Sequence, residues 1–388
     1  MLRIASAFSS HADTAQACRD IAAGLEERLG SSRAEAAIFF ATPGHGPAYG
    51  RIERAIREIA GVGEVVGCSA AGVVSREGER ERGAAVSALA LHGDFAVRRI
   101  FVPALRGRAD EVGRELGRVV ASLDAEPRTL LLLADSYNLA PDELLAGVES
   151  AAPGTVVLGA GASEDGSIGE TTVVGRGVAA SNAVAALAIG GLDVRSMVTQ
   201  GGTPVGRWWT VTRAETNRIL ELEGRPALEV FLAEIPELLR ADLREALRCT
   251  RAALVEQQAD GDQTPPYVVR RLLGADVSQG ALLVGDEVIA GMRFAVAVRD
   301  PAAARESFAR NVEEFAAAGR GIAGALYFNS VERGEALYGI PDLDTAYLRR
   351  SLGDVELAGF FSGAELAPLG GRNRFHQSSG VLVGFAAG

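Results

Sequence analysis

The chain has 388 residues, 48% of them hydrophobic and 23% charged, and a formal net charge of −11 at pH 7. This length predicts roughly two to three domains around a substantial core. The acidic balance argues against nucleic acid or an anionic membrane as a partner, because clustered basic residues bind both. All 39 basic residues are Arg, which excludes a P-loop lysine, a lysine Schiff base and a lysine general base.

Other compositional features favour a protein without metal or cofactor. Cys18, Cys68 and Cys249 lie far apart, which fits neither a disulfide framework nor a zinc site. The four histidines are also too widely spaced for a metal site. No apolar run reaches the ~18 residues of a membrane span, and residues 1–13 do not resemble a signal peptide. We therefore expect a cytoplasmic protein.

Three segments of the chain repeat the order strand, loop, helix, strand and glycine-rich turn. The first has strands at 36–40 and 64–67, a helix at 51–60 and a turn at 65–72. The second has strands at 130–133 and 155–158, a helix at 142–151 and a turn at 156–163. The third has strands at 324–328 and 355–361, a helix at 345–352 and a turn at 357–365. Each spans about 26 to 31 residues, the length of a β-loop-α-β unit, so we expect divergent duplication, with chance similarity as the alternative.

Strand-like segments after the first two turns predict sheets that are not purely parallel. They lie at 84–91, 171–174 and 183–189. The middle of the chain differs, with an amphipathic helical stretch over 226–258, broken near Pro236. Strand candidates at 267–273, 280–284 and 292–298 and a helix from 302 to 318 follow it. The expected fold class is α/β, with two related layered domains of mixed β-sheets flanked by helices and built from duplicated β-loop-α-β units.

The glycine turns put bare backbone where a neighbour or a ligand can approach closely, and we expect them to converge on one pocket. Gly159, Gly161 and Gly166 imitate a dinucleotide fingerprint. That fingerprint needs a helix that starts at the loop, whereas residues 167–174 indicate a strand. Nucleotide binding is therefore not expected.

Several motifs resemble one known family. The turn Val65–Gly72 resembles the signature turn of the FIST N domain, and most of the C-terminal half is similar to the FIST C domain. The pieces that carry the second resemblance are 272–276 with 280–282, 292–300, 324–328 with 332–334, 358–361 and 365–368. The resemblance implies a free-standing pair, a FIST N-like domain at 1–205 and a FIST C-like domain at 206–388. It also implies a sensory module of intracellular signal transduction that binds a small ligand such as an amino acid, with a signalling protein as a partner.

The chain departs from the family pattern at two places. Asn329, Ser330 and Val331 stand where the family commonly has a Cys, with Ser330 as its counterpart. Ala364-Glu365 replaces the usual Gly-Glu. Both departures weaken a thiol-based interpretation of the C-terminal site.

Each candidate site residue has a structural alternative. Cys68 as a nucleophile would need a base and a lowered pKa, and no His or acid stands near it at a recognisable spacing, so packing under the turn is the alternative. Ser69 could bind a ligand or cap its own turn. Arg333 and Glu365 together would suit a zwitterionic ligand, or they could form an internal pair that fixes two loops. A structural role is the alternative for His376.

The leading hypothesis is a small-molecule-binding sensory protein without a catalytic role. The alternatives are a hydrolase that uses Cys68 or Glu365 and a protein-interaction module. The predicted ligand-binding residues are Gly67, Cys68, Ser69, Gly72, Asn329, Arg333, Gly363, Glu365 and His376.

Overall fold

The computed structural model describes residues 2–255, 266–318 and 321–386. It shows a mixed α/β protein with several mixed sheets and a small six-stranded barrel, which confirms the α/β class. No helix in these ranges is long and apolar enough to cross a membrane.

The chain forms two compact units. The larger comprises Met1–Thr199, Phe308–Phe375 and Gly380–Gly388, and the smaller comprises Gln200–Ser307 and His376–Ser379. The larger unit thus draws on both of the domains that the sequence suggests. The predicted boundary after residue 205 separates two family domains, not the two compact units, and it stays a prediction.

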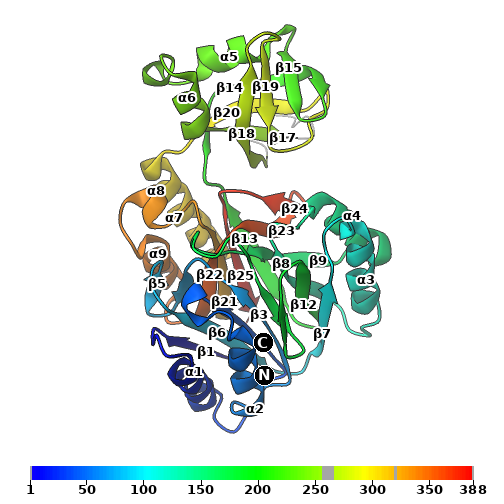
Figure 1. The fold of residues 1–388 in the computed structure, drawn as a ribbon, viewed down its shortest axis with the longest axis vertical. Coiled ribbons are helices and arrows are strands. Elements are labelled where there is room, and N and C mark those ends of the chain that lie inside the picture. Colours follow the sequence, from blue (N-terminus) through cyan, green and yellow to red (C-terminus); the bar gives the residue numbers. More distant parts are fainter. Residues whose placement is uncertain (1, 256–265, 319–320, 387–388) are drawn as a thin grey trace. The chain divides into compact units, whose positions relative to one another are not determined.

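The larger unit consists of three modules with the same order of strands (Figure 1). The first contains β1 (Arg3–Ser9), α1 (Thr14–Leu29), β2 (Ala36–Ala41), α2 (Tyr49–Glu58), β3 (Glu64–Ser69), β4 (Val73–Ser75), β5 (Gly78–Arg80) and β6 (Val86–His92). The second contains β7 (Ala96–Pro103), α3 (Ala109–Ala121), β8 (Arg128–Asp135), α4 (Pro141–Ala151), β9 (Val156–Ala162), β10 (Val173–Gly175), β11 (Val178–Ala180) and β12 (Ala183–Gly190). The third contains β13 (Val194–Thr199), α7 (Pro301–Ala317), β21 (Ile322–Ser330), α8 (Glu335–Tyr338), α9 (Leu343–Leu352), β22 (Glu356–Ser362), β23 (Ala364–Leu369), β24 (Arg372–His376) and β25 (Gly380–Ala386).

Each module builds one six-stranded sheet and gives a hairpin to the sheet of another module. The sheets have the orders β1-β6-β2-β3-β10-β11, β7-β12-β8-β9-β23-β24 and β13-β25-β21-β22-β4-β5. The hairpin of the first module joins the third sheet, that of the second joins the first sheet, and that of the third joins the second sheet. The exchange is cyclic, so no sheet is complete without strands from a neighbouring module.

The parallel pairs β2–β3, β8–β9 and β21–β22 are the three β-loop-α-β segments expected from the sequence. Strands β6, β10 and β12 follow the first two turns. They pair antiparallel with β2, β3 and β8, as expected for mixed sheets. The predicted strand pairs and the helices at their crossovers are therefore confirmed.

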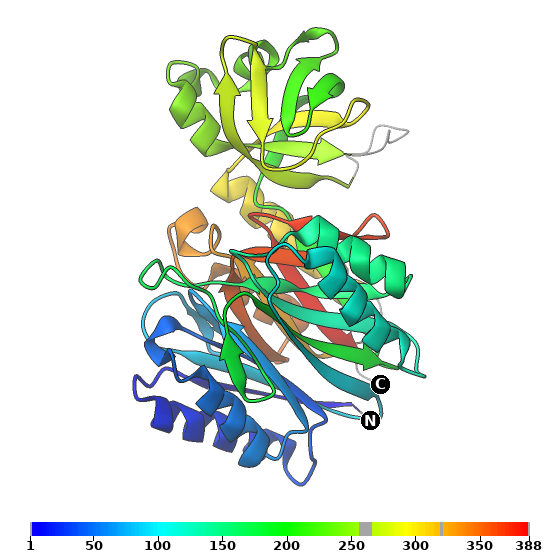
Figure 2. The same ribbon diagram turned by 45° about the vertical axis from the view of Figure 1, so that its right-hand side comes forward.

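The three sheets share one core, to which Phe40, Leu133 and Phe328 contribute from three different sheets. Phe40 stacks on Phe360 with ring centroids 4.6 Å apart. Helices cover the outer faces: α1 and α2 the first, α3 and α4 the second, and α7 and α9 the third (Figures 1 and 2). Because both faces of a central strand such as β2 are buried, its sequence Ala-Ala-Ile-Phe-Phe-Ala is apolar throughout and does not alternate.

The smaller unit contains the barrel. Its strands are β14 (Thr203–Glu215), β15 (Arg218–Leu222), β17 (Thr250–Val255), β18 (Val268–Asp276), β19 (Ala281–Val284) and β20 (Arg293–Val298), with β16 (Arg225–Pro226) added at β15. The pairing of β14 with both β20 and β15 closes the ring.

The helical stretch predicted for residues 226–258 is only partly correct. The structure has two short helices there, α5 (Ala227–Glu234) and α6 (Leu243–Cys249). Residues 250–255 instead form β17, which lies between β18 and β20 and is buried along its length. A strand buried on both faces loses the alternation that would distinguish it from a helix. Residues 256–258 lie outside the described residues.

Candidate functional site

The three glycine turns meet inside the larger unit. The Ser163 N–H donates to the Ser69 carbonyl at 3.1 Å, and the Gly363 N–H donates to the Gly161 carbonyl at 3.0 Å. Another link runs through a side chain: the Ala71 N–H donates to Ser163 Oγ at 2.8 Å, and that hydroxyl donates to the Phe361 carbonyl. The turns do come together, joined by hydrogen bonds that we call the clasp; their convergence on a ligand pocket stays a prediction.

The glycines admit close approach by the protein's own atoms. A Cβ at Gly67 would collide with the ring of Phe39. A Cβ at Gly72 would lie 2.7 Å from the Arg80 carbonyl oxygen, and Gly72 also accepts a hydrogen bond from the Phe361 N–H at 2.9 Å. Both positions therefore need glycine for packing, and ligand contact by them stays a prediction.

Cys68 and Ser69 have structural partners. Cys68 is fully buried in the shared core, and burial raises the pKa of its thiol well above the usual range, so the reactive thiolate is disfavoured. The Ser69 hydroxyl accepts a hydrogen bond from the Thr172 N–H at 2.9 Å. These contacts favour the packing role of Cys68, and they show the Ser69 hydroxyl bonded to a distant segment and not to its own turn.

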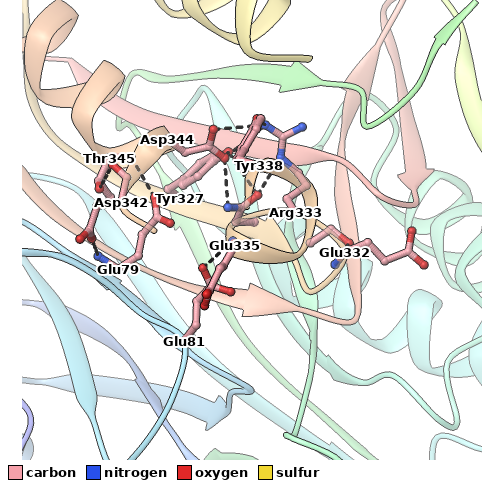
Figure 3. A network of polar contacts seen from close by, with 12 residues as sticks. Glu79, Glu81, Tyr327, Glu332, Arg333, Glu335, Tyr338, Asp342, Asp344 and Thr345 are labelled. Atoms are coloured by element: carbon pink, nitrogen blue, oxygen red, sulfur yellow. Dashed lines mark hydrogen bonds and ion pairs between the residues drawn. The ribbon is translucent and has the colours of Figure 1, made fainter. Parts of the chain in front are cut away.

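A buried polar centre surrounds Arg333 at the ends of β21 and β22 (Figure 3). The side chains of Arg333 and Asp344 are both fully buried and form an ion pair at 3.2 Å. Arg333 also donates from Nε to the side-chain oxygen of Asn329 at 2.9 Å and from Nη2 to the Tyr338 hydroxyl at 2.6 Å. The Tyr327 hydroxyl donates to Asp344 at 2.8 Å. Burial opposes the charge of Arg333, but Asp344 outweighs it, and the pKa of Arg333 lies above its usual value.

This centre unites some of the predicted residues. The Ser362 hydroxyl donates to the Glu365 carboxylate at 2.7 Å. The same hydroxyl lies 3.1 Å from the carbonyl oxygen of Asn329. Asn329 lies on β21 of the third sheet and Arg333 follows that strand, whereas Gly363 follows β22 and Glu365 lies on β23, which belongs to the second sheet. The ion-pair partner of Arg333 is Asp344, which had no signal in the sequence. His376 is the last residue of β24 and is buried, and the division of the chain counts it with the smaller unit.

The exchanged β4–β5 hairpin supplies two carboxylates to the third module. Glu79 accepts from the Thr345 N–H at 3.0 Å, in the first turn of α9, and Glu81 accepts from the Glu335 N–H at 2.8 Å (Figure 3). Burial, together with the nearby carboxylates of Asp344, Glu81 and Asp342, raises the pKa of Glu79 to about 8. The sequence offered no link between residues 79 and 345, because the hairpin exchange is a tertiary feature.

A cleft of about 420 Å³ lies among β1, α1, the β4–β5 hairpin and α9, and we call it the main cleft. Arg28 and Arg76 line it and pair with Glu356 at 3.4 and 3.2 Å. Arg349 also lines it, but within the described part of the chain the guanidinium of Arg349 has no carboxylate partner, and its Nε donates only to the Thr345 carbonyl at 3.5 Å. One cation in the main cleft is therefore available.

The main cleft also holds carboxylates. Asp20 accepts hydrogen bonds from the Ser9 hydroxyl and the Gln16 amide, which lower its pKa, and no ion pair to a described residue reaches it. The Glu77 carboxylate has no hydrogen-bond or ion-pair partner among the residues described. A second hollow of about 240 Å³, the side pocket, shares Phe8, Ser75 and Glu77 with the main cleft and is also lined by Glu79, Arg80 and Asp342.

The described residues contain no group of three His, Cys, Asp or Glu side chains that could hold a metal ion. The chemistry that this arrangement supports is recognition of a polar ligand by charged side chains.

Comparisons with known proteins identify the class of this protein. It contains FIST domains, which are associated with sensing and signalling. The FIST N domain matches residues 35–225, and the FIST C domain matches residues 227–368. Because these matches span most of the chain, the protein belongs to the FIST family.

Two similar proteins are described as uncharacterized. An uncharacterized protein of Mycobacterium tuberculosis is 29% identical over 395 residues, covering 99% of this chain and 100% of the relative. An uncharacterized protein of Mycobacterium bovis is 29% identical over 390 residues, covering 99% of both. Among solved structures, a cyanuric acid hydrolase aligns over 100% of both chains with 10% identity and a TM-score of 0.28, a likeness too low to inform on fold or function.

Proposed function

We propose that this FIST protein is a small-molecule-binding sensory protein of intracellular signal transduction, with an amino acid as the ligand. One observation carries the proposal: the main cleft combines a guanidinium without a carboxylate partner, Arg349, with the carboxylates Asp20 and Glu77, which no described cation pairs. An α-amino acid presents the complementary charges, a carboxylate for Arg349 and an ammonium for a carboxylate. A volume of about 420 Å³ lies within the usual range of small-ligand sites.

The position of the cleft supports a sensory role. Arg349 lies on α9, whose first turn holds Asp344 and Thr345, the partners of Arg333 and Glu79. Glu77 lies on the hairpin that carries Glu79. A ligand that joins Arg349 to Glu77 would therefore tie together the two elements that meet at the buried centre. We propose that this centre passes ligand binding on to a signalling partner.

Direct ligand contact by the nine residues predicted from the sequence stays a prediction. Among them, Arg333 has one group, Nη1, that is buried without a hydrogen-bond partner in the described residues.

The shared strand order and the cyclic hairpin exchange support a common origin of the three modules by duplication. The buried, protonated Cys68 gives no support to a hydrolase.

Isothermal titration with a panel of α-amino acids tests the proposal. We expect at least one to bind, and the Arg349→Gln variant to bind it at least tenfold more weakly. The matched control is Arg350→Gln, since Arg350 is also exposed and neighbours Arg349 in the chain but does not line the cleft. No binding by any amino acid, or equal losses in the two variants, would contradict the proposal.

A further inference from the structure

The side pocket has as many carboxylate residues in its lining as the main cleft but fewer basic residues. Glu77, Glu79 and Asp342 line it, and Arg80, which is exposed, is the basic residue of its lining. Glu79 Oε2 is buried and has no hydrogen-bond partner in the described residues. The lining therefore has an excess of acidic groups and a buried acceptor, Glu79 Oε2, to which no described group donates a hydrogen bond.

The two hollows adjoin at a common wall. Phe8, Ser75 and Glu77 line both, so the part of a ligand that lies at Glu77 in the main cleft is next to the side pocket. Phe8 gives this wall an apolar surface. A chain of methylene groups with a charged end matches such a wall, because long cationic side chains bury their stems and keep the charge among polar groups.

We propose that the ligand is a basic amino acid of lysine or ornithine length, whose side-chain ammonium enters the side pocket. This inference rests on the proposed function, which places the α-carboxylate at Arg349 and the α-ammonium at Asp20 or Glu77. The side-chain ammonium then lies beside Glu79 and Asp342. One ligand thus meets the cation of the main cleft and the acidic groups of both hollows.

The electrostatics of the pocket agree with this assignment. The neighbouring carboxylates that help to raise the pKa of Glu79 to about 8 repel its negative charge, and an ammonium ion beside Glu79 would offset that repulsion. The net charge of −11 also favours the approach of a cationic ligand over an anionic one.

The test compares lysine with norleucine, which has the same carbon chain without the side-chain amine. Isothermal titration of the full chain should give at least tenfold tighter binding for lysine. If norleucine binds as tightly as lysine, the basic ligand is ruled out while the amino-acid site stands. If neither these ligands nor any other amino acid binds, the proposed function is overturned as well.

Two variants then locate the effect. Glu79→Gln keeps an oxygen for the Thr345 N–H, so we expect it to remain folded, as a thermal unfolding scan can verify, and to lose most of the preference for lysine. Arg349→Gln should weaken the binding of lysine and the binding of norleucine by the same factor. Glu143→Gln, at an exposed position on α4 away from both hollows, is the matched control. An unchanged lysine preference in Glu79→Gln would overturn the side pocket as the ammonium site.

Discussion

The hydroxyl of Ser163 joins two of the three glycine turns, and we expect Ser163→Ala to destabilise the larger unit. Ser163 is 6% exposed, and its Oγ accepts from Ala71 N–H and donates to the Phe361 carbonyl. The other three links between turns, Ser163 to Ser69, Gly363 to Gly161 and Phe361 to Gly72, are direct backbone hydrogen bonds, so of these links only this one depends on a side chain.

The magnitude follows from the two groups that lose their partner. Each unsatisfied buried backbone group costs about 1–3 kcal/mol, and Phe361 is only 3% exposed, while Ala71 is partly buried. We therefore expect a loss of about 2–4 kcal/mol in the free energy of unfolding.

Urea unfolding followed by circular dichroism measures this loss, and hydrogen exchange of the peptide that contains Ala71 locates it. The matched control is Ser167→Ala, because Ser167 is exposed and its hydroxyl contacts only the nearby Asp165. The control should change stability by less than about 0.5 kcal/mol. If Ser163→Ala behaves like the control, or if Ala71 keeps its protection, the clasp does not depend on this hydroxyl.

Three further predictions concern the buried centre, the hairpin and the core. Asp344→Asn leaves the buried charge of Arg333 without its counter-ion and should lower the free energy of unfolding, measured with urea, by about 3–5 kcal/mol. The exposed control Asp124→Asn should change it little, and equal effects of the two substitutions would count against a stabilising ion pair. Because the pKa of Glu79 is raised from 4.5 to about 8 in the folded protein, the folded state keeps a proton that the unfolded chain loses, so stability should fall as pH rises from 4.5 to about 8. Glu79→Gln should flatten that slope, which thermal unfolding at several pH values measures, and an unchanged slope would show that Glu79 does not cause it. Iodoacetamide at pH 8 should label Cys249, which is partly exposed, well before the buried Cys68; faster labelling of Cys68 would contradict its packing in the core.

Local patterns in the sequence predicted much of the larger unit. The parallel strand pairs and their helices follow from apolar runs bounded by glycine turns, since short-range chemistry decides those elements. The prediction of a helix at residues 250–255 was wrong because Ala252, Ala253 and Leu254 are buried on both faces of a central strand. An apolar run of this kind has no periodicity that separates strand from helix.

The candidate site was harder to predict than the fold. Asn329 and Arg333 lie four residues apart and could be associated from the sequence. Asp344, Glu79 and Arg349 could not, because the first contacts Arg333 across a loop and the others depend on a hairpin from a different module. Contacts between segments more than two hundred residues apart leave no trace in one sequence.

The hairpin exchange also determines when each sheet can form during synthesis. Besides the strands of its own module, the first sheet needs only β10 and β11, which end at Ala180. It can therefore assemble once about half of the chain has emerged. The β4–β5 hairpin has to wait for β22, which begins at Glu356, and until then its pairing edge is open. An open edge pairs with other chains. This long wait makes the hairpin the segment through which two nascent molecules would exchange strands.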